Sequence, residues 1–186
     1  MAHSISTHAV QNEYDYFTAV DDCAAEDNAG AGHLGTVEYN SSTLYRYATV
    51  NVLELAGQVG QEKAAEVVKA FGEAFIKSMP TGKQNTFANR TLPDVVYVTL
   101  REDQPVNLCG AFEKAVARSA QGYVEASKAA LQGYAQQMYA NFADAPVKSF
   151  TVGQGLEELA PAQPLSAMLD ALKSSVKEML DRNEVE

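Results

Sequence analysis

The feature that most constrains the fold is a change in sequence periodicity near Gly60. Before it, residues 43–53 alternate in type along a run rich in aromatic and β-branched side chains, which is typical of a strand. After it, apolar residues recur at helical spacing on one face: Ala64, Val67, Val68, Phe71 and Phe75. We therefore predict a strand over 43–53 and a helix over 61–78, with Lys77 in its last turn.

Weaker signals surround these two elements. Residues 5–16 predict a β-rich start in which Ile5, Val10 and Tyr14 are buried. A long irregular stretch follows, from about Tyr16 to Asn40. Further β segments are expected at 94–101, 106–113 and 147–152, a long helix at 118–142 with an apolar stripe that ends at Phe142, and an amphipathic final helix from Leu165 to Leu180.

The order of these elements predicts an α+β fold with a mostly antiparallel sheet. We expect the strands at 43–53 and 94–101 to share one sheet, against which the helix at 61–78 packs. The pattern fits the second half of a ferredoxin-like unit, which needs crossover helices on one sheet face. The 186 residues are enough for one domain with its own core.

Composition narrows the class of protein. An apolar share of 46% is ordinary for a globular chain, and no apolar run is long enough to span a bilayer. The first residues have neither the basic region nor the apolar stretch of a signal peptide. Cys23 and Cys109 form no metal-binding, redox or disulfide pattern. We therefore expect a cytoplasmic protein with reduced thiols and no membrane partner.

The formal charge of −10 argues against nucleic-acid binding when it is taken alone. Its distribution matters more, because no Lys or Arg occurs before Arg46 although seven acids fall in the first forty residues. The middle third carries a group of cations around the predicted strands and loop: Arg46, Lys77, Lys83, Arg90 and Arg101. A local basic surface on an acidic protein is compatible with this pattern.

The polar loop at 81–91 contains Thr81, Gly82 and Lys83, which resemble the end of a phosphate-binding P-loop. The required earlier glycine is replaced by Lys77, and the residue after the lysine is Gln84 rather than Ser or Thr. Two interpretations stay open for this loop. It is either an ordinary solvated turn or a basic loop that contacts nucleic-acid phosphates through Lys83, Gln84, Asn85 and Arg90.

Other candidate chemistry is weaker. The spacing of His8, Cys23 and His33 with Asp21 or Asp22 matches no known metal site, so we expect no metal. The glycines from Gly30 to Gly35 match no dinucleotide fingerprint and favour a hinge. No Ser, Cys or His lies in a nucleophile motif, and no catalytic constellation can be assembled. We therefore expect a protein without a cofactor that is not an enzyme.

Aromatic residues flank the irregular stretch on both sides: Tyr14, Tyr16 and Phe17 precede it, and Tyr39, Tyr45 and Tyr47 follow it. Rings beside a flexible loop can stack on, or wedge between, unpaired bases. They can equally fill the core, and composition alone does not choose between these roles.

Several segments together resemble the CasC-type backbone subunit of Cascade, the type I-E CRISPR surveillance complex. They cover residues 3 to about 115 in the expected order: Thr7 to Asp22, Gly30 to His33, Tyr39 to Tyr47, Met79 to Thr91 and Gln104 to Lys114. The last seventy residues match only as a helical tail.

This resemblance implies an incomplete RRM-like palm within the single domain 1–186. Residues 10–40 would form a thumb-like insertion, 41–115 the palm strands and helix, and 116–186 the helical tail. In that family the thumb kinks a guide RNA and flips out one base at intervals, and here Phe17 and Thr18 match the wedge. Implied partners are guide RNA (crRNA), other backbone subunits, and target DNA through base pairing to the guide. Lys77 and the loop residues at 83, 84, 85 and 90 complete the implied RNA-binding set.

Members of this family are about twice this length, and the sequence before His3 has no counterpart here. We expect the missing half to hold the first palm strand and much of the basic surface, so that direct affinity for RNA is low. Two functions follow as alternatives. The chain is either the carboxy-terminal portion of a guide-RNA-binding backbone subunit, or a truncated mimic that acts as an anti-CRISPR decoy and blocks Cascade assembly.

Overall fold

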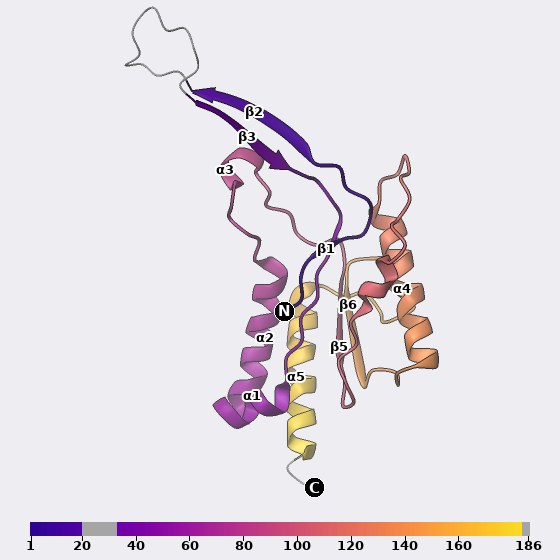
Figure 1. Ribbon diagram of the computed structural model, residues 1–186. Helices are drawn as coiled ribbons and strands as arrows, with labels where there is room; N and C mark the ends of the chain where they lie inside the picture. Colours follow the sequence, from indigo (N-terminus) through magenta and orange to yellow (C-terminus); the bar gives the residue numbers. More distant parts are fainter. Residues whose placement is uncertain (20–32, 184–186) are drawn as a thin grey trace, which may run out of the picture.

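The computed structural model describes residues 1–19 and 33–183 and combines helices with short antiparallel strands (Figure 1). The predicted α+β class is thereby confirmed. In chain order the elements are β1 (Ile5–Ser6), β2 (Glu13–Ala19), β3 (His33–Tyr39), β4 (Leu44–Tyr45), α1 (Val52–Val59), α2 (Gln61–Lys77), α3 (Gln84–Phe87), β5 (Val96–Leu100), the 3-10 helix η1 (Leu108–Phe112), α4 (Val124–Asn141), β6 (Lys148–Val152) and α5 (Leu165–Asn183).

The antiparallel ribbon of β5 and β6 lies between two helical layers (Figure 1). Successive strand residues point to opposite faces, so the ribbon contributes to two cores. Val96, Val98, Leu100 and Phe150 belong to the core that α2 and α5 cover. Tyr97 belongs to the core that α4 and η1 cover.

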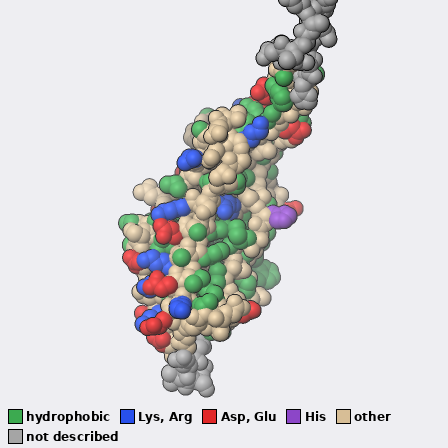
Figure 2. Space-filling model, turned by 90° about the vertical axis from the view of Figure 1, so that its left-hand side faces the viewer, with side chains coloured by type: hydrophobic (Ala, Val, Ile, Leu, Met, Phe, Trp, Pro, Cys, Tyr) green, Lys and Arg blue, Asp and Glu red, His purple; other side chains and the backbone are tan. Residues whose placement is uncertain are grey.

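The amphipathic prediction for the final helix is confirmed, although Leu165 at its start is only partly buried. Its buried face consists of Met168, Leu169, Leu172, Val176, Met179 and Leu180. On α2, Ala64, Ala65, Val68 and Ile76 are buried against this face, whereas the predicted core residue Val67 is 41% exposed. Ion pairs between Lys69 and Asp170, and between Lys173 and Glu66, join the two helices along one edge. Figure 2 shows the face that carries α1 and α2, with charged side chains along one side and hydrophobic side chains in the middle.

The prediction that the strands at 43–53 and 94–101 share one sheet is wrong. Among the described residues there are three separate two-stranded sheets, so β4 pairs with β1 while β5 pairs with β6. The predicted strand at 43–53 is reduced to Leu44–Tyr45, and its last two residues open α1 instead. Asn51 caps that helix, because its side-chain oxygen accepts a hydrogen bond from the Glu54 N–H at 3.1 Å.

Two other element predictions need correction. The segment at 106–113, which we expected to be a strand, contains the 3-10 helix η1. The side-chain oxygen of Asn107, the residue before this helix, accepts a hydrogen bond of 3.0 Å from the Cys109 N–H. The long helix begins at Val124 rather than 118. Phe142, which was placed on its apolar stripe, lies just beyond the helix end and is 79% exposed.

The amino-terminal region also differs from the prediction. The β-rich start contains only β1 before Glu13, and Tyr14 is 56% exposed instead of buried. Part of the stretch expected to be irregular forms the ladder between β2 and β3. The acids at 21 and 22, Cys23 and the hinge glycines at 30 and 32 lie outside the described residues. The division into 10–40, 41–115 and 116–186 stays a prediction.

Candidate nucleic-acid interface

Strands β2 and β3 form a two-stranded arm that extends away from the helical layers (Figure 1). The register pairs Glu13 with Tyr39 at the root and Ala19 with His33 at the far end. All seven β2 residues are exposed. Directly paired residues share a face, so the register decides which side chains act together.

Phe17 pairs with Gly35, and its ring lies across that glycine. A Cβ atom built on Gly35 would lie 2.4 Å from the Phe17 Cζ atom, so a larger residue there would push the ring away. The Phe17 side chain nevertheless keeps 45% of its surface exposed. Thr18 pairs with Leu34 and therefore projects from the opposite face. The two residues of the predicted wedge are neighbours in sequence but serve different faces of the arm.

The face that carries Thr18 also carries a stripe of apolar surface. Tyr14, Tyr16 and Leu34 are 56%, 70% and 68% exposed, respectively. Alternation along β2 places both tyrosines on this side, with their Cα atoms about 7 Å apart. The question that composition left open is thus answered for these rings, which do not fill the core.

The root of the arm rests against α3. The Tyr39 hydroxyl donates a hydrogen bond of 2.6 Å to Glu13 Oε2, which closes the first pair of the ladder. This bond to a carboxylate raises the pKa of Tyr39 above its ordinary value. The Tyr39 ring lies 5.0 Å from the Phe87 ring, which ends α3. The tertiary structure therefore brings the loop at 81–91 to the base of the arm.

Within that loop, α3 is a single turn held between two residues in the left-handed region, Lys83 with φ 56° and Ala88 with φ 48°. Non-glycine residues rarely adopt this conformation, and such strain gathers at binding sites. Arg90 Nη2 donates to Gln84 Oε1 at 3.1 Å, so two predicted site residues are in contact. Lys83 and Asn85 are exposed beside them.

Lys77 is the predicted site residue with the least freedom to bind phosphate. Its ammonium pairs with Glu73 Oε1 at 2.5 Å, and the hydrogen bond from Lys77 lowers the pKa of Glu73. Arg46 belongs to the group of cations in the middle third of the sequence, but it was not among the predicted RNA-binding residues. Its guanidinium lies 4.6 Å from the centre of the Phe75 ring and donates to the Ser78 carbonyl at 3.4 Å. Figure 2 shows Lys and Arg side chains on the upper part of this face, below the arm.

The six predicted residues outside α2 thus form two groups. Phe17 and Thr18 lie near the far end of the described ladder, four pairs beyond the root, which is about 14 Å along the strand. The loop residues Lys83, Gln84, Asn85 and Arg90 lie at the root. Arg46 could have been found only from a contact map, because nothing in its local sequence links it to the end of α2.

A polar cluster, the neck, holds the two segments that lead into the arm. It consists of the buried residues Thr7, His8 and Ser127 and the partly buried residues Thr43 and Tyr123. The Thr7 N–H donates to the Thr43 carbonyl at 2.9 Å, and the Thr43 N–H donates to His8 Nε2 at 3.2 Å. His8 Nδ1 lies 2.8 Å from the Ala9 carbonyl oxygen and must carry the hydrogen, since Nε2 is an acceptor. The imidazole also stacks on the Tyr123 ring at 3.6 Å.

The neck continues into α4. Ser127 Oγ lies 2.8 Å from Thr7 Oγ1 and 2.7 Å from the Tyr123 carbonyl oxygen. His8 therefore links the segment before the arm to the segment after it. In the described part of the chain, no group of three or more His, Cys, Asp or Glu side chains is arranged to hold a metal ion. Among the described helices, none has the length and apolar character required to cross a membrane.

Comparisons with known proteins give a consistent assignment. The family model described as CT1975-like protein matches residues 1–181. No curated protein matches the chain by sequence. A solved structure titled "CRISPR RNA-guided surveillance complex" contains a chain that is 33% identical, with a TM-score of 0.84; the alignment covers 94% of this chain and 68% of that one.

A second structure, titled "CRISPR RNA-guided surveillance complex, pre-nicking", contains a chain that is 32% identical, with a TM-score of 0.80. That alignment covers 94% of this chain and 54% of the other, so this protein spans about half the length of that relative. Both similarities extend over the helical tail as well as over the segments that carried the resemblance in sequence. The chain belongs to the CT1975-like protein family, as its resemblance to a backbone subunit of a CRISPR surveillance complex predicted.

Proposed function

We propose that this chain is a guide-RNA-binding component of the backbone of a Cascade-type surveillance complex of type I-E, and that it acts by binding rather than by catalysis. The relatives of known structure come from complexes described as RNA-guided, which supports an RNA partner. In this proposal the arm positions bases, while the loop at its root contacts phosphates. Other backbone subunits supply the remaining RNA contacts.

The observation that carries the proposal is the position of Phe17. Its ring is held against Gly35, and almost half of its surface is exposed. An aromatic ring held in this way can fill the gap that an extruded base leaves in a stack.

The charges of the described arm are consistent with separate surfaces for bases and for phosphates. Glu13, Asp15 and Glu38 are acidic, and no Lys or Arg lies between residues 13 and 39. Phosphate contacts therefore belong to Lys83 and Arg90 at the root, together with Arg46. Single-stranded RNA is commonly bound by such a combination of stacking side chains and a separate basic surface.

We expect Phe17→Ala to weaken guide-RNA binding by the assembled complex by about 1–3 kcal/mol, the usual effect of losing one stacked base. The matched control is Tyr14→Ala, which removes a ring of similar size from the opposite face of the same strand. Filter binding of labelled guide RNA to complexes reconstituted with each variant measures both effects. If the two variants lose the same affinity, Phe17 has no special role, and the proposed wedge is wrong.

We expect Lys83→Ala and Arg90→Ala each to reduce the salt dependence of RNA binding. Each lost phosphate contact lowers the slope of log K against log salt concentration by about 0.7 for single strands. Lys63→Ala, which removes an exposed cation from the far end of α2, is the control for net charge. RNA titrations at three salt concentrations provide the slopes. A slope that changes equally in all three variants would place the phosphate contacts elsewhere.

A further inference from the structure

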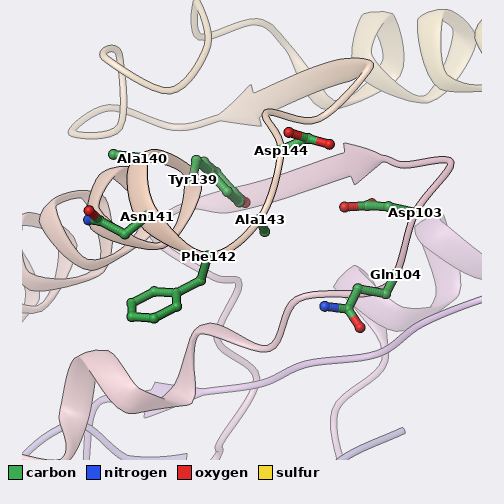
Figure 3. A pocket seen from close by; sticks show the side chains of 8 residues that line it. All are labelled: Asp103, Gln104, Tyr139, Ala140, Asn141, Phe142, Ala143 and Asp144. Atoms are coloured by element: carbon green, nitrogen blue, oxygen red, sulfur yellow. The ribbon is translucent and has the colours of Figure 1, made fainter.

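A pocket of about 560 Å³ lies on the side of the molecule formed by the end of α4 and the loop after β5. Figure 3 shows its lining: Asp103, Gln104, Tyr139, Ala140, Asn141, Phe142, Ala143 and Asp144. None of these residues belongs to the arm or to the loop at its root, so the candidate RNA interface does not use this pocket. Its wall, its charge and its one exposed ring each indicate the kind of ligand it fits.

The wall of the pocket is fixed by Arg101, whose side chain is only 6% exposed. Its Nε donates to Asp103 Oδ1 at 2.8 Å, and its Nη2 donates to Asp103 Oδ2 at 2.6 Å. The same guanidinium donates to the main-chain oxygens of Gln104 at 2.9 Å and Asp144 at 2.7 Å. One buried cation therefore joins the two segments that line the pocket, and this holds Asp103 and Asp144 in place before any ligand binds.

The charge of the pocket is negative. The charge of Arg101 is balanced by Asp103, and this hydrogen bond lowers the pKa of Asp103. The carboxylate of Asp144 is exposed and lies beside that of Asp103 (Figure 3). The last turn of α4 contains no basic residue, so the negative end of the helix dipole also faces this region. No Lys or Arg is among the lining residues.

Phe142 adds an aromatic surface to this negative pocket. It follows the last residue of α4 and leaves 79% of its side chain exposed, which is unusual for so large an apolar group. The ring lies across the pocket from Asp103 and Gln104 (Figure 3). The Asp144 carboxylate and this aromatic ring provide charge pairing and cation–π attraction in one pocket, and a guanidinium or ammonium group is what uses both.

We propose that this pocket binds the cationic side chain of an arginine or lysine from a protein partner. A phosphate is repelled by Asp144 and by the end of α4. A neutral apolar group would leave the Asp144 carboxylate and the amides of Gln104 and Asn141 without new partners. The formal charge of −10 attracts a basic partner to the whole protein, and the pocket provides a defined position for one of its side chains.

The test is a titration of the isotopically labelled full chain with a blocked Gly-Arg-Gly peptide, followed by amide chemical shifts at low ionic strength. The comparison peptide contains citrulline, which keeps the shape of arginine without its charge. We expect saturable shifts at residues 103–104 and 139–144, and a Kd for the citrulline peptide that is higher by about tenfold. Equal affinity for both peptides, or no shifts at these residues at about 10 mM peptide, would overturn the proposal.

Substitutions show which residues of the pocket contribute to binding. We expect Asp144→Asn to raise the Kd of the arginine peptide by about fivefold, and Phe142→Ala by about threefold. Glu62→Gln removes the same charge from the exposed start of α2 and should leave the Kd unchanged. If Glu62→Gln weakens binding as much as Asp144→Asn, the attraction is general rather than local. If a nucleoside monophosphate binds these residues more tightly than the arginine peptide, the pocket is a base site and the proposal is wrong.

Discussion

Replacing Gly153 by alanine is expected to lower the free energy of unfolding by about 2–5 kcal/mol, through backbone strain and overpacking. Gly153 follows the last residue of β6 and has a φ of +83°, which L-residues rarely adopt. A Cβ atom there would lie 2.2 Å from the Asp94 carbonyl oxygen and 3.2 Å from the Val95 Cα. The obstacle is main chain, so the strands β5 and β6 must separate to accommodate it.

Gly122→Ala is a matched control for this substitution. Its φ of +82° is almost the same, but nothing lies within 4 Å of the position a Cβ would take. The control should therefore cost only the backbone strain, about 1–2 kcal/mol. Urea unfolding of the two variants separates strain from collision. Equal losses would show that the chain relaxes around Asp94, and that the close approach of the two strands is not required.

His8→Ala is expected to lower the free energy of unfolding by about 2–4 kcal/mol, because it removes both a stacked ring and the acceptor for a partly buried N–H. His8 is 8% exposed and connects the two segments of the chain that enter the arm. Without the imidazole, the Thr43 N–H has no acceptor at this position. The neck should then open more readily than the helical cores.

Two measurements test the role of His8. His3→Ala, which changes an exposed histidine near the start of the chain, should alter the unfolding free energy by no more than about 0.5 kcal/mol. Hydrogen exchange at the Thr43 amide should accelerate in His8→Ala and stay slow in His3→Ala. An unchanged exchange rate at Thr43 would mean that the contact between Thr43 and His8 does not hold the neck closed.

The helical elements could be predicted because their signals are local. The face of α5 is marked by apolar residues at helical spacing, and those residues are buried as expected. On α2 the same reasoning identified Ala64 and Val68 but misplaced Val67, because periodicity locates a face only to within one residue at its edge. The strand β5 could also be identified from its β-branched run.

The prediction of a strand over 43–53 was wrong for a different reason. A strand needs a partner, and alternation in sequence specifies two faces without naming what pairs with them. In the structure the regular ladder with β1 ends at the pair of Ile5 and Tyr45, beyond which the Ala2 N–H still donates to the Tyr47 carbonyl oxygen at 3.0 Å. Val52 and its neighbours then form α1, where their backbone groups bond within the helix itself.

The arm could be predicted only in part. Tyr14 and Tyr16 alternate with acidic residues, but alternation does not identify the partner strand, and the register that places Phe17 on Gly35 joins segments on either side of thirteen residues outside the described chain. For the candidate site, the sequence by itself determined which residue types were available, and resemblance named Phe17 and the loop. Only the tertiary structure decided which of them meet: the contact between Tyr39 and Phe87 brings the loop to the root of the arm. Such contacts join residues far apart in the chain, and no local pattern encodes them.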